Sequence, residues 1–228
     1  VLGLTIDYGP YGWLEVYDTS WTPNTTDANQ RRYCFGNQAQ MTLWNLARFA
    51  ESLTTLIPDT QGLEEAILRD YGDRFTTGHK TMALQKIGIF RERAEEDDAL
   101  LEGLGKCLRL GETDMTLFYR KLAELRIYAA EPDDLPAQEL LEPLRDAWYQ
   151  PNEISPDHQK TLGDWLRRYI RRVSEESLAD SERKALMNRI NPKYVMRNYL
   201  AQLAIEKQEA GDSSVLHELM QVMQKPYD

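Results

Sequence analysis

The chain of 228 residues has an ordinary globular composition, with 42% hydrophobic residues and a formal net charge of −10. A chain of this length can bury a core of its own, as one large domain or two small ones. The acidic balance argues against nucleic-acid and anionic-membrane partners, because both require a basic surface that neutralises phosphates. The two cysteines, Cys34 and Cys107, form no disulfide framework, so we expect a reducing compartment and a cytoplasmic location.

The first ten residues predict a short β-strand that ends in a carboxylate. The apolar residues that recur at the two-residue period of a strand are Leu2, Leu4 and Ile6. Asp7 is expected at the strand end, because the following Gly9-Pro10 cannot continue a ladder. Protein kinases hold magnesium on nucleotide phosphates with an Asp-Phe-Gly triplet, of which Asp7-Tyr8-Gly9 is an aromatic variant. From the pattern alone, an Asp followed by Gly is more often an ordinary turn residue.

The chain begins at Val1 inside this predicted strand. Because a strand needs neighbours that satisfy its backbone, we expect a fragment whose N-terminal part is missing. The aromatic-rich residues 11–17 predict a short second strand or a helical turn, and 18–30 predict a loop. Residues 1–37 are therefore expected to form a β element and loop.

The rest of the chain predicts one helix after another. Apolar residues at helical spacing, closed by Pro58, predict a core helix from about Gln38 to Leu56, and the tryptophans are expected in the core. Thr60 and Asp114 are expected to cap helices, and Gly72 to end one. The other predicted helices lie near 63–71, 77–90, 100–108, 115–128, 137–148, 156–174, 180–188, 191–210 and 213–224. We therefore expect a mainly α fold, with one helical domain over residues 38–228.

Three separated stretches carry a resemblance to a known family. They are Leu2 to Tyr17, then Arg32-Tyr33 through Asn37-Gln38 with Leu43 to Arg48, and finally Asn191-Pro192-Lys193-Tyr194 with Arg197-Asn198-Tyr199. In this order they resemble the selenoprotein O family, also known as the YdiU family. The resemblance spans most of the chain, and residues 90–180 match only loosely.

The resemblance implies a protein-kinase-like fold of which this chain is the helical C-terminal lobe. It implies transfer of AMP from ATP to Ser, Thr or Tyr hydroxyls of proteins, with bound Mg²⁺ or Mn²⁺. In this family Asp7 would be the metal-binding and nucleotide-binding aspartate, equivalent to the Asp of Asp-Phe-Gly. The proton-accepting Asp, a metal-binding Asn and the groups that hold the ATP phosphates would all precede Val1. We therefore expect little or no activity from this chain alone, since one carboxylate without positioned phosphates is a poor site for Mg²⁺.

The sequence departs from the family pattern in three places. Arg31 stands where the family usually has Gly, and Ala39 stands where it usually has Pro. Both differences concern loop and helix-start geometry and leave the metal ligand unaffected. Many members also end in a redox pair with cysteine or selenocysteine, whereas this chain stops at Asp228 without one.

Two other functions stay open on the sequence. A helical interaction or regulatory domain without chemistry would use Asp7 as a turn residue. A conventional protein kinase would share the metal role of Asp7 but would transfer phosphate.

The remaining polar motifs are interpreted structurally. The run Glu95-Glu96-Asp97-Asp98 indicates a solvated helix N-terminus. Cys34 and Cys107 are expected to be buried. The pair Arg197-Asn198 could grip a phosphate, but its expected place in the middle of a helix favours ties to neighbouring carboxylates. The residues expected at the surface or at helix caps are His79, His158 and His217.

Overall fold

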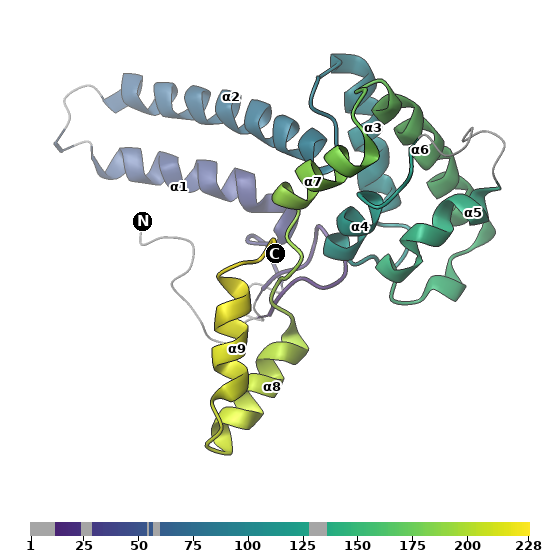
Figure 1. Ribbon diagram of the computed structural model, residues 1–228. Helices are drawn as coiled ribbons and strands as arrows, with labels where there is room; N and C mark the ends of the chain where they lie inside the picture. Colours follow the sequence, from purple (N-terminus) through teal and green to yellow (C-terminus); the bar gives the residue numbers. More distant parts are fainter. Residues whose placement is uncertain (1–11, 24–28, 54, 57–59, 128–135) are drawn as a thin grey trace. The chain divides into compact units, whose positions relative to one another are not determined.

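The computed structural model describes residues 12–23, 29–53, 55–56, 60–127 and 136–228. Within these ranges the chain is mainly helical, as the sequence predicts, and its β structure consists of isolated bridges (Figure 1). The predicted opening strand lies outside the described residues. None of the helices in the described ranges combines the length and the apolar character that a membrane crossing requires.

The helices follow one another from residue 35 to residue 223. The α-helices are α1 (Gln38–Ser52), α2 (Thr60–Lys86), α3 (Ala94–Cys107), α4 (Met115–Leu122), α5 (Ala137–Leu141), α6 (Pro156–Ser174), α7 (Asp180–Ile190), α8 (Asn198–Glu209) and α9 (Ser214–Met223). The 3-10 helices are η2 (Phe35–Asn37), η3 (Glu142–Ala147) and η4 (Pro151–Glu153). The chain divides into two compact units, Val1–Leu14 with Asp18–Lys80 and Glu15–Tyr17 with Thr81–Asp228. The expected regions 1–37 and 38–228 stay a prediction.

The first unit contains an antiparallel pair formed by α1 and most of α2 (Figure 1). The Tyr71 hydroxyl donates a hydrogen bond to the Ala39 carbonyl (2.9 Å) and ties the two helices together. The buried residues of α1 are Ala47 and Ala50, whereas Trp44 is 42% exposed and lies under the Arg32 guanidinium. The prediction that α1 is a core helix is wrong in this unit, because among the described side chains of α1 only two small ones are buried.

The prediction of two helices separated at Gly72 is wrong, because α2 is a single helix. It runs without interruption from Thr60 to Lys86, through both Gly72 and Gly78. A glycine inside a helix costs only about 1 kcal/mol relative to alanine, so a long helix tolerates it. Thr60, expected as a cap, is the first helical residue.

The core of the second unit is built around α6, whose bounds match the prediction. Helix α6 packs against α3 and α5, and α4 packs against η3. The Trp165 indole donates to the Leu100 carbonyl (3.0 Å), and the Tyr169 hydroxyl donates to the Ile87 carbonyl (2.9 Å). These bonds satisfy the polar ends of two large buried side chains. The residues of α6 that face this core are Leu162, Trp165, Leu166, Tyr169, Ile170 and Val173.

Helix ends in the second unit differ from the sequence predictions in three places. Helix α4 ends at Leu122 rather than at about 128, and the helix predicted over 137–148 is α5 followed by η3. The helix predicted to begin at Asn191 begins at Asn198. Asn191 instead ends α7, and its buried side-chain amide donates to the carbonyls of Lys86 (2.8 Å) and Met187 (3.0 Å). An Asn-Pro pair serves a turn as well as a helix start, so the sequence pattern alone does not separate them.

Candidate functional site

The predicted metal ligand Asp7 lies outside the residues that the structure describes, so its role stays a prediction. The described chain resumes at Gly12, whose amide donates to the Pro23 carbonyl (2.8 Å) within the first unit. Across the described ranges, no three His, Cys, Asp or Glu side chains come together in a way that could hold a metal ion. The predicted metal site is therefore not part of the chain that the structure describes.

The segment Glu15–Tyr17 joins the second unit at the start of α4. Val16 forms an antiparallel bridge with Asp114, and the Tyr17 amide donates to the Thr113 carbonyl (2.8 Å). This stretch, for which the sequence predicts a short strand or a helical turn, is thus extended at an isolated bridge. These two contacts lie nine and ten positions after Asp7 in the chain.

Asp114 uses both of its carboxylate oxygens. Oδ1 accepts from the Leu117 amide (3.0 Å), which confirms the predicted cap of α4. Oδ2 lies 2.7 Å from the Arg197 guanidinium, and the two side chains are only 6% and 14% exposed. Burial raises the pKa of the nearby Tyr149 hydroxyl, and the negative charge of Asp114 raises it further. That phenol is therefore protonated at neutral pH.

The pair Arg197-Asn198 binds carboxylates, as the sequence predicts. Arg197 pairs with Asp114, and the backbone amide of Asn198 donates to Glu15 Oε1 (2.8 Å). The two residues stand at the start of α8 rather than in the middle of a helix. The sequence predicts that the partners are carboxylates but does not identify Glu15 and Asp114, because no local pattern links residues so far apart along the chain.

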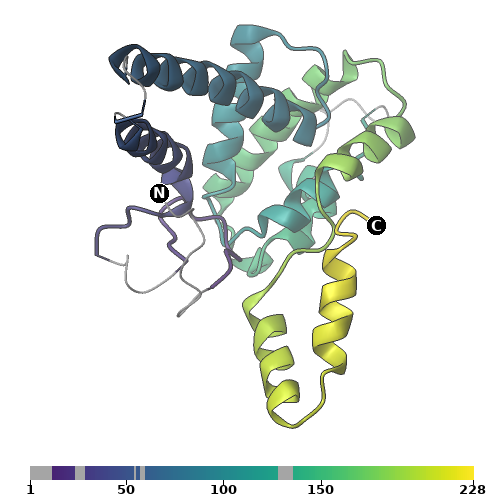
Figure 2. The same cartoon turned by 90° about the vertical axis from the view of Figure 1, so that its left-hand side faces the viewer.

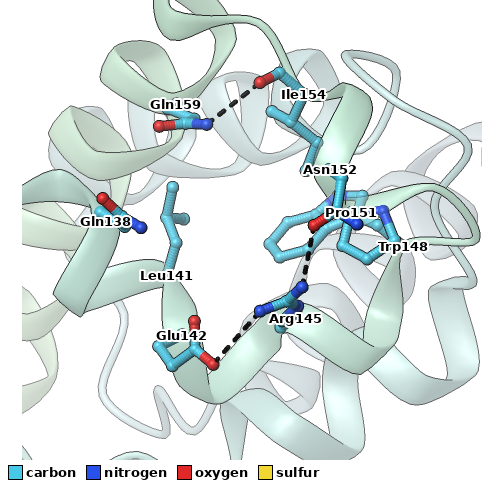
Figure 3. Close-up of a pocket in the computed structure, with 9 residues that line it drawn as sticks. All are labelled: Gln138, Leu141, Glu142, Arg145, Trp148, Pro151, Asn152, Ile154 and Gln159. Atoms are coloured by element: carbon cyan, nitrogen blue, oxygen red, sulfur yellow. Dashed lines mark hydrogen bonds and ion pairs between the residues drawn. The ribbon is translucent and has the colours of Figure 1, made fainter.

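A pocket of about 230 Å³ opens between α5, η3, η4 and α6 (Figure 3). Arg145 donates to Asn152 Oδ1 (2.8 Å), and Gln159 donates to the Ile154 carbonyl (3.0 Å). The lining residues are Gln138, Leu141, Glu142, Arg145, Trp148, Pro151, Asn152, Ile154 and Gln159.

A second hollow, of about 430 Å³, lies between α8 and α9, which run side by side (Figure 2). Its wall is almost entirely apolar. The lining residues are Met196, Ala201, Ala204, Ile205, Gln208, Glu209, Leu216, Leu219, Met220 and Met223. Such a surface can accept apolar side chains, and it carries no group that could take part in phosphate chemistry other than Glu209.

The acidic run at the start of α3 differs from the prediction at one residue. Glu95, Glu96 and Asp97 lie in the first turn of the helix, as expected, but Asp97 is fully buried. Its Oδ1 lies 2.7 Å from Arg172 Nε, and Glu176 Oε1 lies 2.8 Å from another nitrogen of the same guanidinium. Asp97 is thus part of a buried ionic cluster and not of a solvated helix end.

The cysteines and histidines offer no nucleophile or metal site in the described chain. Cys34 and Cys107 are buried, as predicted. Burial raises the pKa of the Cys107 thiol to about 11, against the lowering effect of Arg168, so the reactive thiolate is scarce at neutral pH. His79 and His217 are exposed, as predicted, and His158 is half-buried in the first turn of α6.

Comparison with known proteins gives a consistent result along the chain. The model of the family described as protein adenylyltransferase SelO matches residues 1–224. The chain is similar to a protein nucleotidyltransferase YdiU of Rhodopirellula baltica, with 44% identity over 232 residues that cover 100% of this chain and 43% of the relative. The protein of the same name from Flavobacterium johnsoniae is 44% identical over 228 residues, covering 100% of this chain and 42% of the relative. For Nitrosospira multiformis the identity is 45% over 244 residues, with 100% and 43% covered. The chain thus spans less than half the length of these curated relatives.

Proposed function

Because the chain belongs to the SelO family of protein adenylyltransferases, we propose that it forms the C-terminal part of an enzyme that transfers AMP from ATP to Ser, Thr or Tyr hydroxyls of proteins. The family match over residues 1–224 carries the proposal, since this range includes the Asp7-Tyr8-Gly9 triplet and both later motifs. The matched relatives are more than twice as long as this chain, so the activity is proposed for the longer enzyme. In this proposal the fold is kinase-like, residues 1–7 form the opening strand, and the enzyme is cytoplasmic.

Asp7 is proposed to hold Mg²⁺ or Mn²⁺ on the phosphates of ATP. A carboxylate oxygen is the type of donor that these hard cations bind, usually one or two at a time together with substrate phosphates and water. The bound ion would supply positive charge that stabilises the phosphate oxygens as pyrophosphate leaves. The chain alone is proposed to have little or no activity, because one carboxylate without positioned phosphates is a poor site for Mg²⁺.

The identity of the transferred group tests the proposal. The intact enzyme is incubated with protein substrate, Mg²⁺ and ATP labelled either at the α-phosphate or at the γ-phosphate. We expect protein to retain the α label only, since AMP carries that phosphorus. Retention of the γ label would identify a conventional protein kinase, and retention of neither label would favour a non-catalytic helical domain. The 228-residue chain alone is expected to transfer neither label.

The metal role of Asp7 is tested separately by substitution. Asp7→Ala in the intact enzyme is expected to lower metal-dependent AMP transfer by roughly 100-fold or more, the scale found when one group that stabilises transition-state charge is removed. The matched control is Asp18→Ala, because the exposed Asp18 carboxylate accepts hydrogen bonds from the amide and hydroxyl of Ser20, two positions along the chain. Turnover within a few-fold of wild type in Asp7→Ala would show that the metal role is wrong.

A further inference from the structure

A narrow pocket in the second unit has apolar walls that face each other. It is the pocket of about 230 Å³ between α5, η3, η4 and α6, and its lining lies within one unit and within the described residues 136–228. Figure 3 shows the Leu141 side chain on one side of the space and Trp148 with Pro151 on the other. Leu141 and Trp148 are buried and Ile154 packs against the same core, so close packing holds the walls in place. We call this pocket the Leu141 slot.

Side-chain amides border the Leu141 slot in fixed positions. Gln159 donates to the Ile154 carbonyl (3.0 Å), and Asn152 Oδ1 accepts from Arg145 (2.8 Å). A carboxamide carries two N–H donors and an oxygen with two lone pairs, so one such bond fixes the group and leaves it able to bond a ligand. Gln138, which is exposed on α5, adds a third carboxamide at the edge of the slot.

The charge and the size of the Leu141 slot restrict what can bind there. Its described lining carries one positive and one negative side chain, Arg145 and Glu142, whose charged groups lie 3.8 Å apart. A phosphate or a nucleotide requires an excess of positive charge, which this balanced pair does not supply. The volume is also below the roughly 300–1,000 Å³ typical of sites that enclose a whole small molecule. The slot therefore suits a small neutral group that belongs to a longer molecule.

An extended peptide has this chemistry. Each of its residues presents a backbone N–H, a carbonyl and a side chain. An aliphatic side chain that enters between Leu141 and Trp148 is removed from water, and the carboxamides of Gln138 and Gln159 can bond the adjoining backbone. Because the walls and Gln159 are already held in place, little side-chain freedom is lost on binding.

We propose that the Leu141 slot binds a short extended segment of the protein substrate, with one aliphatic side chain between Leu141 and Trp148. The docking role rests on the proposed function, in which the intact enzyme acts on proteins, whereas binding of a peptide does not depend on it. The slot contributes affinity for the protein at a point other than the hydroxyl that receives AMP. Binding energy of this kind lowers the KM for the protein substrate and leaves kcat unchanged.

Peptide binding to the intact enzyme is measured by saturation-transfer difference NMR. The probe is the blocked pentapeptide Ac-Ala-Ala-Leu-Ala-Ala-NH2, and its counterpart has Asp in place of Leu. We expect the Leu peptide to bind with a Kd on the order of 1 mM and to receive the strongest saturation at its Leu methyl groups. The Asp peptide should not bind detectably, because its carboxylate would lose hydration against apolar walls.

The variant Gln138→Trp tests whether the peptide occupies the slot. Gln138 is exposed, so a larger side chain there can cover the opening without entering the core. We expect the Kd of the Leu peptide and the KM for the protein substrate each to rise about tenfold or more, with kcat and the KM for Mg·ATP within about threefold of wild type. The matched control is Glu139→Trp, because Glu139 is the next exposed residue of α5 and does not line the slot. Should Gln138→Trp fail to fold, Asn152→Trp at another exposed edge carries the test.

Three binding and kinetic results would overturn the inference. Absence of saturation transfer to the Leu peptide in wild type would show that the slot does not bind a peptide. An unchanged Kd in Gln138→Trp would place the peptide elsewhere, for example between α8 and α9. An unchanged KM for the protein substrate, despite loss of peptide binding, would show that the slot is not a docking site for that substrate.

Failure of the proposed function itself has a different signature. A wild-type enzyme that transfers no AMP would remove the proposed function and the docking role with it. This outcome is distinct from the other three, because peptide binding is measured without catalysis.

Discussion

The ionic cluster of Asp97, Arg172 and Glu176 is buried in the second unit, with the side chains of the Asp97–Arg172 pair 0% and 2% exposed. Removal of one partner from a buried pair leaves an uncompensated charge, which typically costs about 3–5 kcal/mol. We therefore expect Asp97→Ala to lower the free energy of unfolding by about 3 kcal/mol, the low end of that range, because Glu176 still faces Arg172 (2.8 Å). Urea denaturation measures the change.

Glu95→Ala is the matched control for Asp97→Ala. Glu95 lies in the same first turn of α3 but is exposed, so its loss should change stability by no more than about 0.5 kcal/mol. Equal effects of the two substitutions would mean that the cluster contributes nothing beyond the helix-dipole interaction. The sequence predicts all four acidic residues of this run as solvated, and it could not identify Asp97 as the buried one because its partner lies on α6.

Helix α2 contains two glycines that the fold does not require. A Cβ atom added at Gly72 or Gly78 would meet no atom within 4 Å. Alanine in a helix interior is more favourable than glycine by about 0.5–1 kcal/mol, so Gly72→Ala and Gly78→Ala should each stabilise the first unit by this amount. Thermal or chemical denaturation followed by far-UV circular dichroism measures the gain.

Gly88→Ala is expected to have the opposite effect on stability from the two substitutions in α2. Gly88 has φ of +79°, and a Cβ there would lie 2.9 Å from the Met187 sulfur, so the substitution should destabilise the second unit. A loss of stability in Gly72→Ala would contradict the continuous helix and would favour the two separate helices that the sequence pattern predicts.

The elements that the sequence predicts well are those whose signals are local. The apolar stripe and the Ser155-Pro156 start define α6, and Asp114 caps α4 through a residue three positions away. The errors arise where a helix end or the burial of a side chain depends on distant contacts, or where a helix tolerates a glycine that disfavours it only weakly. Trp44 is exposed because few of the described side chains cover that face of α1, and Asn191 ends α7 because its side-chain amide bonds to the distant Lys86 carbonyl. The contacts of Arg197 and Asn198 have the same origin, since their partners Asp114 and Glu15 come from two other parts of the chain.

The two compact units differ in how much apolar surface they bury. Among the described residues of the first unit, the buried apolar side chains are Cys34, Ala47 and Ala50. The second unit holds a continuous cluster of large side chains, including Phe118, Trp165 and Tyr169. Burial of apolar area is the main source of stability, so the two units should open with different free energies.

Amide hydrogen exchange on the 228-residue chain tests this difference in stability. Amides of α1 can exchange by local opening of a helix whose buried residues are two alanines. Amides of α6 exchange only when the core of the second unit opens. We expect α1 to exchange roughly 100-fold faster than α6 or more, which corresponds to a difference of about 2.7 kcal/mol in opening free energy. The comparison uses amides in the middle of each helix, because terminal turns fray in any helix. Equal protection would mean that the exposed face of α1, including Trp44, is covered in solution, since the seam alone cannot supply that stability.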